Sequence, residues 1–263
     1  MKKLFALVLA LVLALSTLSV LAETTEKKTL IMATNAQFPP YEYYDGEDIV
    51  GIDVEIADAV AKYMGYNLKI DDMDFEAIIA AVQTGKADFG MAGMTVTADR
   101  LVTVNFSNSY ATGVQAVIVK EGSAITCVDD LFADNAKFKI GVQLGTTGDI
   151  YVEELELDGK AIVSRFNSGN DAVMALVAGK IDCVLIDNEP AKAYVAANQG
   201  LKVLETAYSV EDYAACFAKS NTELLDKFNQ ALEALTLDGT IPAIIEKYIP
   251  TQQVAEEATE AAE

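Results

Sequence analysis

The segment at residues 90–100, GMAGMTVTADR, places two glycines, two threonine hydroxyls and one guanidinium within a short stretch. Glycine lets the main chain approach a ligand closely, and Thr97 can cap a helix that carries Arg100 in its first turn. N–H groups at a helix start and a planar guanidinium suit a carboxylate, and they would also suit a phosphate. The alternative is that Arg100 is a solvated surface residue and Thr97 only a cap.

A carboxylate lies in a comparable place further along the chain. Asp187 ends an apolar run, IDCVLID, and is followed by Asn188, Glu189 and Pro190. Its alternative role is to cap a helix that starts at Pro190, which would contribute about 1 kcal/mol. If Arg100 and Asp187 face each other from separate parts of the fold, they would hold the two ends of a zwitterion. The pair therefore predicts an amino-acid site.

An internal repeat supports two such parts. The segments AAVQTGKADFGMAG (residues 80–93) and MALVAGKIDCVLID (residues 174–187) align without a gap. In each copy an apolar helix ends at a glycine, a lysine follows, and Asp88 or Asp182 opens a buried strand. A generic helix stop followed by a strand is the alternative. A true repeat predicts two similar lobes, with ligands at the carboxyl ends of the strands, near Gly93 and Asp187.

The first lobe is expected to contain a strand at residues 30–33, a turn-rich loop in ATNAQFPPYEY, a helix capped by Asp53 and stopped by Gly65, a strand near Leu68, a helix at residues 75–84 and a strand at residues 87–91. The order strand, helix, strand, helix, strand predicts a mainly parallel sheet covered by helices.

The second lobe is expected to begin near Val114, with a strand at Ile140 and helices up to Glu156, at residues 171–178 and from Pro190. A late strand at residues 213–217 and helices from Thr222 and Thr240 would return to the first lobe. The chain would then pass between the lobes twice, and the two connecting segments would form a two-stranded hinge. The expected division is a signal peptide (1–22), lobe 1 (23–110 and 213–250), lobe 2 (111–212) and a disordered acidic tail (251–263).

Composition excludes several function classes. The 263-residue chain has a net charge of −21, which opposes binding to nucleic acid and to anionic lipid surfaces. It contains no histidine, so a histidine-assisted nucleophile is excluded and the commonest transition-metal ligand is missing. Adjacent acidic pairs such as Asp71 and Asp72 point in different directions on a regular element. We therefore expect no metal and no cofactor.

The three cysteines cannot all pair within the chain. Cys183 and Cys216 lie in apolar, strand-like runs, which predicts buried thiols rather than a disulfide or a nucleophile. Cys127 does not lie in such an apolar run, so its burial is not predicted.

The first 22 residues have a basic pair, a continuous apolar run and a small-residue ending. This pattern is typical of a secretory signal peptide, and the alternative is an uncleaved membrane anchor. No cysteine lies near the expected cleavage region, which argues against attachment through a lipid-modified cysteine. The mature chain is expected outside the cytoplasm, in the periplasm or at the cell surface.

Several motifs in a fixed order give the chain a wider likeness. They are ATNAQFPPYEY, VGIDVEIADAVA, MDFEAIIAAVQTGKADFGMAGMTVTADR, VNFSNSY, IGVQLGTTGD and AGKIDCVLIDNEPA. Over residues 29–250 the chain resembles the family 3 extracellular solute-binding proteins, the amino-acid receptors of ATP-binding-cassette (ABC) importers. The resemblance implies an α/β, two-lobed periplasmic-binding-protein-like fold, in which each lobe is a mainly parallel sheet flanked by helices and the lobes are joined by a two-stranded hinge.

The resemblance also implies a role for each matching position. Arg100 and Thr95 would bind the ligand α-carboxylate, helped by the main chain at Ala92 and Gly93 and by Thr146 or Thr147. Asp187 would pair with the α-ammonium. Phe38 and Phe75 would flank the ligand side chain, and Asn35 and Gln143 would tune its chemistry. Because Asn35 and Gln143 are uncharged, this set predicts a neutral, polar L-amino acid such as glutamine, followed by cystine or an aliphatic residue.

The resemblance further implies that the lobes close over the ligand and that the permease of an ABC importer reads the closed form, with the chain acting as a monomer. An enzyme on the same scaffold, similar to cyclohexadienyl dehydratase, is the main alternative. Glu189 would then be its acid, although a glutamate just before Pro190 is also favoured by the helix dipole. A soluble amino-acid sensor is a third possibility. We expect a binding protein and no enzyme.

Overall fold

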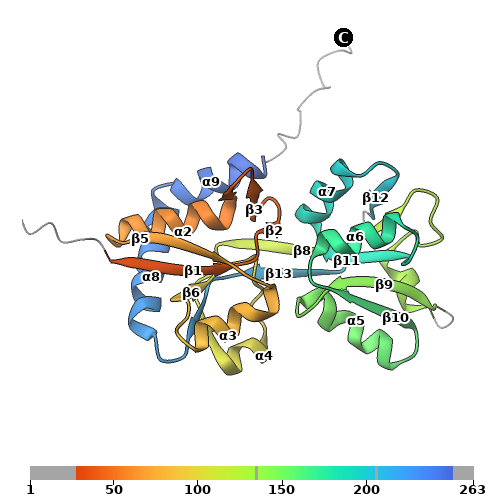
Figure 1. Ribbon diagram of the computed structural model, residues 1–263, viewed down its shortest axis with the longest axis horizontal. Helices are drawn as coiled ribbons and strands as arrows, with labels where there is room; N and C mark the ends of the chain where they lie inside the picture. The colour runs from red at the N-terminus through yellow and green to blue at the C-terminus, as the bar shows by residue number, and fades with distance from the viewer. Residues whose placement is uncertain (1–27, 134–135, 205–206, 251–263) are drawn as a thin grey trace, which may run out of the picture.

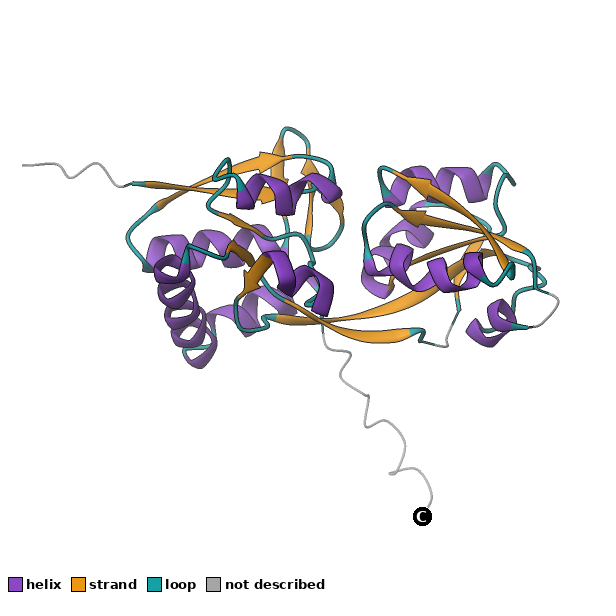
Figure 2. Ribbon diagram, turned by 90° about the horizontal axis from the view of Figure 1, so that it is seen from below, coloured by secondary structure: helices purple, strands orange, loops and turns teal. Residues whose placement is uncertain are grey.

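The computed structural model describes residues 28–133, 136–204 and 207–250. The expected signal peptide and acidic tail lie outside these residues. Two lobes of mixed α/β structure lie side by side, and two long strands run between them (Figures 1 and 2). The two-lobed α/β fold expected from the sequence is confirmed.

A five-stranded sheet forms the centre of the first lobe. Its strands, in spatial order, are β5 (Asn67–Asp72), β1 (Thr29–Thr34), β6 (Phe89–Gly90), β14 (Cys216–Ala218) and β7 (Val104–Phe106). The first three are parallel, whereas β14 runs antiparallel to both of its neighbours. The sheet is therefore mainly parallel, as expected, with β14 as its one reversed strand, which the chain supplies on its return from the second lobe.

Helices cover both faces of this sheet. They are α2 (Ile52–Tyr63), the 3-10 helix η2 (Phe75–Ala77), α3 (Ile78–Gln83), α4 (Ala98–Thr103), α8 (Thr222–Leu237) and α9 (Thr240–Tyr248). The two late helices pack against α2 and close the core behind the sheet (Figure 1). Phe89, Phe217 and Phe228 form a buried aromatic cluster there, with ring centroids 5.2 to 5.8 Å apart.

Helix α2 begins differently from the expectation. Its buried residues Ile52, Ile56 and Val60 recur at helical spacing, and Gly65 follows its end with a φ of 82°. The cap position is occupied by Gly51, however, and no side chain caps the helix. The predicted cap role of Asp53 is wrong, because this residue lies inside the first turn and its side chain faces the interior.

The segment expected to be a turn-rich loop contains a small antiparallel sheet. Its strands are β2 (Gln37–Phe38), β3 (Glu42–Asp45) and β4 (Asp48–Val50). The strands are too short to show an alternating pattern, so turn residues dominated the sequence signal. This sheet places Phe38 opposite Glu42.

A six-stranded sheet forms the centre of the second lobe. Its strands are β10 (Ala161–Phe166), β9 (Phe138–Gln143), β11 (Cys183–Asp187), β8 (Ala111–Lys120) and β12 (Leu201–Val203), with β13 (Ser209–Tyr213) also paired to β8. The helices are the 3-10 helix η3 (Val128–Phe132), α5 (Thr147–Leu157), α6 (Gly169–Val177) and α7 (Asn188–Ala197). Strands β10, β9 and β11 are parallel, and β8 is antiparallel to its neighbours.

The internal repeat has the same structure in both lobes. Asp88 accepts a hydrogen bond from the N–H of Ile31 on β1, and Asp182 accepts one from the N–H of Lys139 on β9, each over 2.7 Å. In return, the main-chain N–H of Asp88 donates to the carbonyl of Ile31, and that of Asp182 donates to the carbonyl of Lys139, each over 2.8 Å. The aspartate of the motif therefore fixes the start of β6 against β1 in the first lobe and the start of β11 against β9 in the second.

The two crossings form a hinge of paired strands. β13 pairs antiparallel with β8, from Ser209 opposite Gln115 to Tyr213 opposite Ala111. Gly113 lies against the Tyr213 ring, since a Cβ there would come within 2.2 Å of the tyrosine hydroxyl. The expected two-stranded hinge is confirmed (Figure 2).

Cys183 and Cys216 are fully buried free thiols, as predicted. Burial raises the pKa of each to about 12, so neither is a reactive thiolate at neutral pH. Within the described ranges no helix combines the length and apolar character needed to cross a membrane.

Candidate functional site

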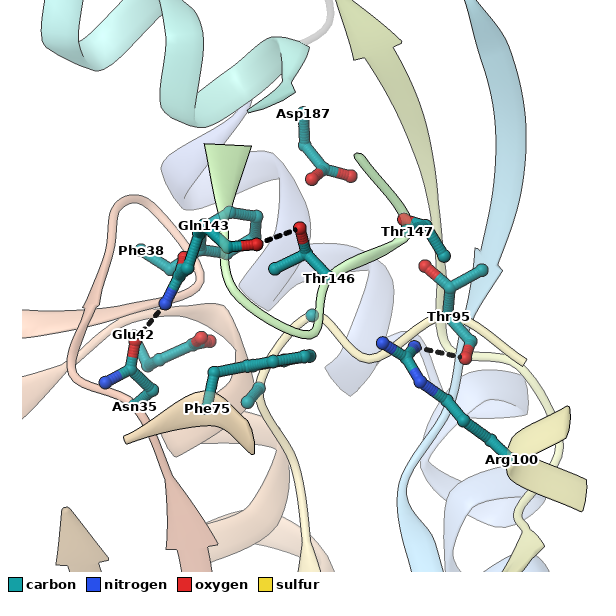
Figure 3. A pocket seen from close by; sticks show the side chains of 12 residues that line it. Asn35, Phe38, Glu42, Phe75, Thr95, Arg100, Gln143, Thr146, Thr147 and Asp187 are labelled. Atoms are coloured by element: carbon teal, nitrogen blue, oxygen red, sulfur yellow. Dashed lines mark hydrogen bonds between the residues drawn. The ribbon is translucent and has the colours of Figure 1, made fainter. Parts of the chain in front are cut away.

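A cavity lies between the lobes. Its lining residues are Asn35, Phe38, Glu42, Phe75, Ala92, Gly93, Thr95, Arg100, Gln143, Thr146, Thr147 and Asp187. All eleven residues singled out from the sequence are in this set, and Glu42 is the additional member. Figure 3 shows that the side chains approach one space from opposite sides, with Arg100 and Thr95 at one end and Asn35, Gln143 and Glu42 at the other.

Arg100 is held by the start of helix α4. Thr97 is the cap, and its hydroxyl accepts a hydrogen bond from the N–H of Arg100 over 3.2 Å. The guanidinium donates to the carbonyl oxygens of Thr95 (2.8 Å) and Gly145 (3.0 Å) and lies 5.4 Å from the centroid of the Phe75 ring. No ion pair among the described residues includes Arg100, although its side chain is buried. Its charge is available to an anion.

Two main-chain N–H groups lie near this guanidinium. Thr95 is bridged to Tyr213, but the hydrogen bonds of that bridge run from Val96 to Asp212 and from Ala214 to Met94. The N–H of Thr95 is thus left out of the ladder. Thr147 is the first residue of α5, where N–H groups have no partner within the helix. Both groups can donate to a ligand.

Thr146 has a more local role than the sequence suggested. It is the cap of α5, and its hydroxyl accepts from the N–H of Asp149 (3.4 Å) and donates to the carbonyl of Gln143 (2.8 Å). Its hydroxyl proton is therefore already used within the second lobe, although the side chain lines the cavity.

Asp187 lies at the carboxyl end of β11, where it was expected. It occupies the cap position of α7, but its side chain makes no capping hydrogen bond. Its carboxylate instead accepts a hydrogen bond from the hydroxyl of Tyr213 on the hinge. Burial, together with the nearby charge of Glu211, raises the pKa of Asp187 to about 7, against the opposing effect of the Tyr213 hydrogen bond. A cation beside Asp187 would stabilise the charged form of its carboxylate.

At the opposite end of the cavity, Gln143 connects the lobes. Its amide nitrogen donates to the side-chain oxygen of Asn35 (2.9 Å) and to the carbonyl of Asn167 (3.1 Å), and the Asn35 amide donates to the carbonyl of Met73 (2.9 Å). Phe38 and Phe75 provide the apolar walls (Figure 3).

Glu42 is the residue that sequence reasoning missed. Its side chain is completely buried, and its carboxyl lies beside that of Asp53, to which it donates a hydrogen bond when it is protonated. Burial, reinforced by the neighbouring Asp53, raises the pKa of Glu42 well above its usual range. An acid between two tyrosines, Tyr41 and Tyr43, was the signal that could have identified it. Two acids buried side by side can both ionise only at a high cost, unless a ligand supplies a cation or further hydrogen-bond donors.

Asp53 supports the cavity from behind. Its carboxylate accepts hydrogen bonds from the N–H of Gly93 (2.8 Å) and the hydroxyl of Tyr110 (2.7 Å). Burial raises the pKa of Asp53 to about 6 even though both of these hydrogen bonds favour the charged form. Gly93 itself has a φ of 52°, and a Cβ there would lie 2.7 Å from the Phe38 ring. The main chain at this point is therefore fixed and exposed to the cavity.

Glu189, the acid of the enzymatic alternative, is not among the cavity-lining residues. Its carboxylate pairs with Lys192 over 2.5 Å on helix α7. Among the described residues no group of three or more metal-ligating side chains is placed to hold a metal ion.

The profile of the family described as "Bacterial extracellular solute-binding proteins, family 3" matches residues 30–251. The "Arginine-binding extracellular protein ArtP" of Bacillus subtilis (strain 168) is 34% identical over 224 residues, which cover 84% of this chain and 86% of that protein.

Solved structures of amino-acid-binding proteins are also similar to this chain. One, described as the substrate binding protein of an amino acid ABC transporter, is 35% identical, with a TM-score of 0.78 over 85% of this chain and 100% of that chain. An ancestral arginine-binding protein is 38% identical with a TM-score of 0.79, and its arginine complex covers 84% of this chain and 98% of that chain. The same TM-score applies to its glutamine complex, with coverages of 86% and 99%. These proteins are named for binding.

Proposed function

Because the chain belongs to the family 3 bacterial extracellular solute-binding proteins, which bind amino acids for ABC transport, we propose that it captures one L-amino acid in the cavity between its lobes. Closure about the β8–β13 hinge would bury the ligand and present both lobes to a permease. The observation that carries the proposal is the convergence of one unpaired guanidinium and one buried carboxylate, from different lobes, on a single cavity.

The carboxylate end of the ligand would lie against the first lobe. Arg100 offers a planar guanidinium without an acidic partner, and Thr95 offers an N–H outside the sheet ladder. Thr147 adds an N–H at the start of α5 from the second lobe. Three donors of this kind suit one carboxylate, and the contribution of Thr147 is available only when the lobes are together.

The ammonium end would lie against Asp187. This carboxylate is buried and has a raised pKa, so a cation at hydrogen-bond distance would favour its charged form. The Tyr213 hydroxyl holds the carboxylate in place from the hinge side.

The side chain of the ligand would extend between Phe38 and Phe75 toward Glu42. Once the two ends of the zwitterion are paired, Glu42 remains as a buried carboxyl whose neighbour is another acid, Asp53, and no cation lies beside it among the described residues. A guanidinium or ammonium on the ligand side chain would supply both the missing donors and the balancing charge. We therefore favour a cationic L-amino acid, with arginine first, and the name of the ArtP relative is consistent with that choice.

A neutral, glutamine-like ligand is the second candidate, and it was the expectation from sequence. The amides of Asn35 and Gln143 lie at the side-chain end and carry no charge. The raised pKa of Glu42 also allows it to stay protonated and to donate to a neutral amide oxygen. One related ancestral protein has been solved with glutamine bound.

Further parts of the proposal follow from sequence. We assign residues 23–110 and 213–250 to lobe 1 and residues 111–212 to lobe 2, and we propose secretion through the signal peptide at residues 1–22. The mature chain would act as a monomer in the periplasm or at the cell surface.

A thermal-shift screen of the ligand-free chain against the common L-amino acids tests this function. A ligand at about a hundred times its Kd should stabilise the fold by about 2.7 kcal/mol. We expect the largest rise in Tm with L-arginine. A screen in which no L-amino acid raises the Tm would contradict amino-acid capture, and a rise with glutamine but not arginine would select the second candidate.

A further inference from the structure

Glu211 is a buried carboxylate on the hinge that the binding scheme does not use. It lies on β13 opposite Gly113, and its side chain is only 5% exposed. One of its oxygens, Oε2, accepts hydrogen bonds from the hydroxyls of Thr95 (2.7 Å) and Thr147 (2.9 Å) and from the amide of Gln115 (3.4 Å). The other, Oε1, has no partner among the described residues. The carboxylate therefore joins a threonine of each lobe to the hinge.

The protons in this cluster determine what the two threonines can do. A hydroxyl has a single proton, and an ionised carboxylate can only accept. While Thr95 and Thr147 donate to Glu211, neither hydroxyl can donate to a second carboxylate. A ligand carboxylate at this end of the cavity must then be bound through the main-chain N–H groups of the same two residues and through Arg100.

The contact also spans the opening between the lobes. Thr95 belongs to the segment after β6 in the first lobe, whereas Thr147 begins α5 in the second. Their hydroxyls reach the same oxygen atom, so separation of the lobes would break at least one of the two hydrogen bonds. No ion pair among the described residues includes Glu211, although the charge of Arg100 acts on it from a distance and the Tyr151 hydroxyl lies close by. The two threonine hydroxyls are its shortest hydrogen-bond donors.

We propose that Glu211 is a positioning residue that acts as a clasp: it ties the hydroxyls of Thr95 and Thr147 together at the hinge, stabilises the closed arrangement without ligand, and turns the N–H groups of both threonines toward the ligand carboxylate. This inference rests on the proposed carboxylate site for its second effect but not for its first. A protein whose binding-competent arrangement is populated in advance binds its ligand more tightly in proportion to that population.

The first test is made without ligand, by small-angle X-ray scattering of the purified chain. Thr147→Val removes one arm of the clasp and keeps the shape of the side chain, and Glu211→Met removes the acceptor. We expect a larger radius of gyration for both variants than for the wild type. Thr147→Ser retains the hydroxyl and Asp212→Asn removes an exposed carboxylate from the same strand, so both should scatter like the wild type.

If Thr147→Val and the wild type give the same ligand-free scattering profile, the clasp is overturned. Thr147→Val keeps this test valid if Glu211→Met fails to fold. Because no ligand is present, the result does not depend on whether the proposed function is correct.

The second test is a double-mutant cycle on the affinity for L-arginine. Loss of one hydrogen bond in the clasp should weaken binding about two- to tenfold in Thr147→Val. The same substitution should have no further effect in Glu211→Met, because the hydroxyl acts only through the glutamate. An equal loss in both backgrounds would show that the hydroxyl contacts the ligand directly and would overturn the positioning role. Absence of arginine binding in the wild type would instead count against the proposed ligand, and the scattering result would still decide the clasp.

Discussion

The guanidinium of Arg100 donates a hydrogen bond to the carbonyl oxygen of Gly145 over 3.0 Å, which connects a side chain of the first lobe to the loop before α5 in the second. Two carbonyl oxygens, those of Gly145 and Thr95, accept from this cation. A carboxylate is a stronger acceptor for a guanidinium than a carbonyl is. A ligand carboxylate can therefore join or replace these contacts while the lobes remain together.

Replacement of this side chain should abolish most of the affinity. In Arg100→Ala the ligand carboxylate would be buried without its cation, and the binding free energy should fall by about 2–5 kcal/mol. Lys86→Ala, which removes an exposed cation of the same lobe, should bind like the wild type. Calorimetry on both variants makes the comparison, and equal affinities would remove Arg100 from the site.

Glu42 should decide between cationic and neutral ligands. Glu42→Gln removes the acid at the side-chain end, so the affinity for L-arginine should fall by about 1.5–3 kcal/mol, the range for a hydrogen bond to a charged group. The affinity for L-glutamine should change much less. Glu47→Gln, on the exposed turn of the same small sheet, is the matched control. If arginine binds equally well to Glu42→Gln, the cationic assignment is wrong.

Binding should depend on pH through Asp187. In the ligand-free chain its pKa is raised to about 7, and a ligand ammonium would lower it, so binding below pH 7 must release a proton. The affinity should therefore increase as the pH rises toward 7 and level off above it. Titrations in buffers of different ionisation enthalpy report the proton directly. An affinity independent of pH between about 5 and 8 would contradict the pairing with Asp187.

Gly93 should be required for its close approach as well as for its backbone conformation. Gly93 and Gly46 both have a positive φ, 52° and 66°, but a Cβ at Gly46 would meet nothing within 4 Å. Alanine at either position should cost about 1–2 kcal/mol of stability for the left-handed conformation. Only Gly93→Ala, whose Cβ would displace Phe38, should also lose ligand affinity. Denaturant midpoints and calorimetry separate the two effects, and unchanged affinity in Gly93→Ala would refute the argument.

Much of the fold could be predicted because its signals are local and repeated. The glycine that ends a helix and the aspartate that opens the next strand occur twice, and Asp88 and Asp182 make the same hydrogen bonds in their respective lobes. The two-stranded hinge also followed from the order of elements.

The wrong cap role of Asp53 and the omission of Glu42 share a physical cause. Asp53 has the residue type and position of a helix cap, yet its partner is Gly93, 40 residues further along the chain. Glu42 lies in a segment rich in turn residues, and its side-chain neighbour, Asp53, belongs to the helix that follows that segment. Such long-range contacts leave no periodic signal in the sequence. The residues of the cavity were identified because they match functional positions of the family motifs, several of them just after a strand. Glu42 also lies within one of these motifs, but inside strand β3, and no role was assigned to it.

Isothermal titration calorimetry of the ligand-free chain with L-arginine and with agmatine, which is arginine without its carboxylate, tests the central claim most directly. The account predicts one L-arginine bound per chain and an affinity for agmatine lower by about 30-fold or more, because Arg100 and the N–H groups of Thr95 and Thr147 would lose their anion. Equal affinity for the two compounds, or no saturable heat with either L-arginine or L-glutamine, would contradict it.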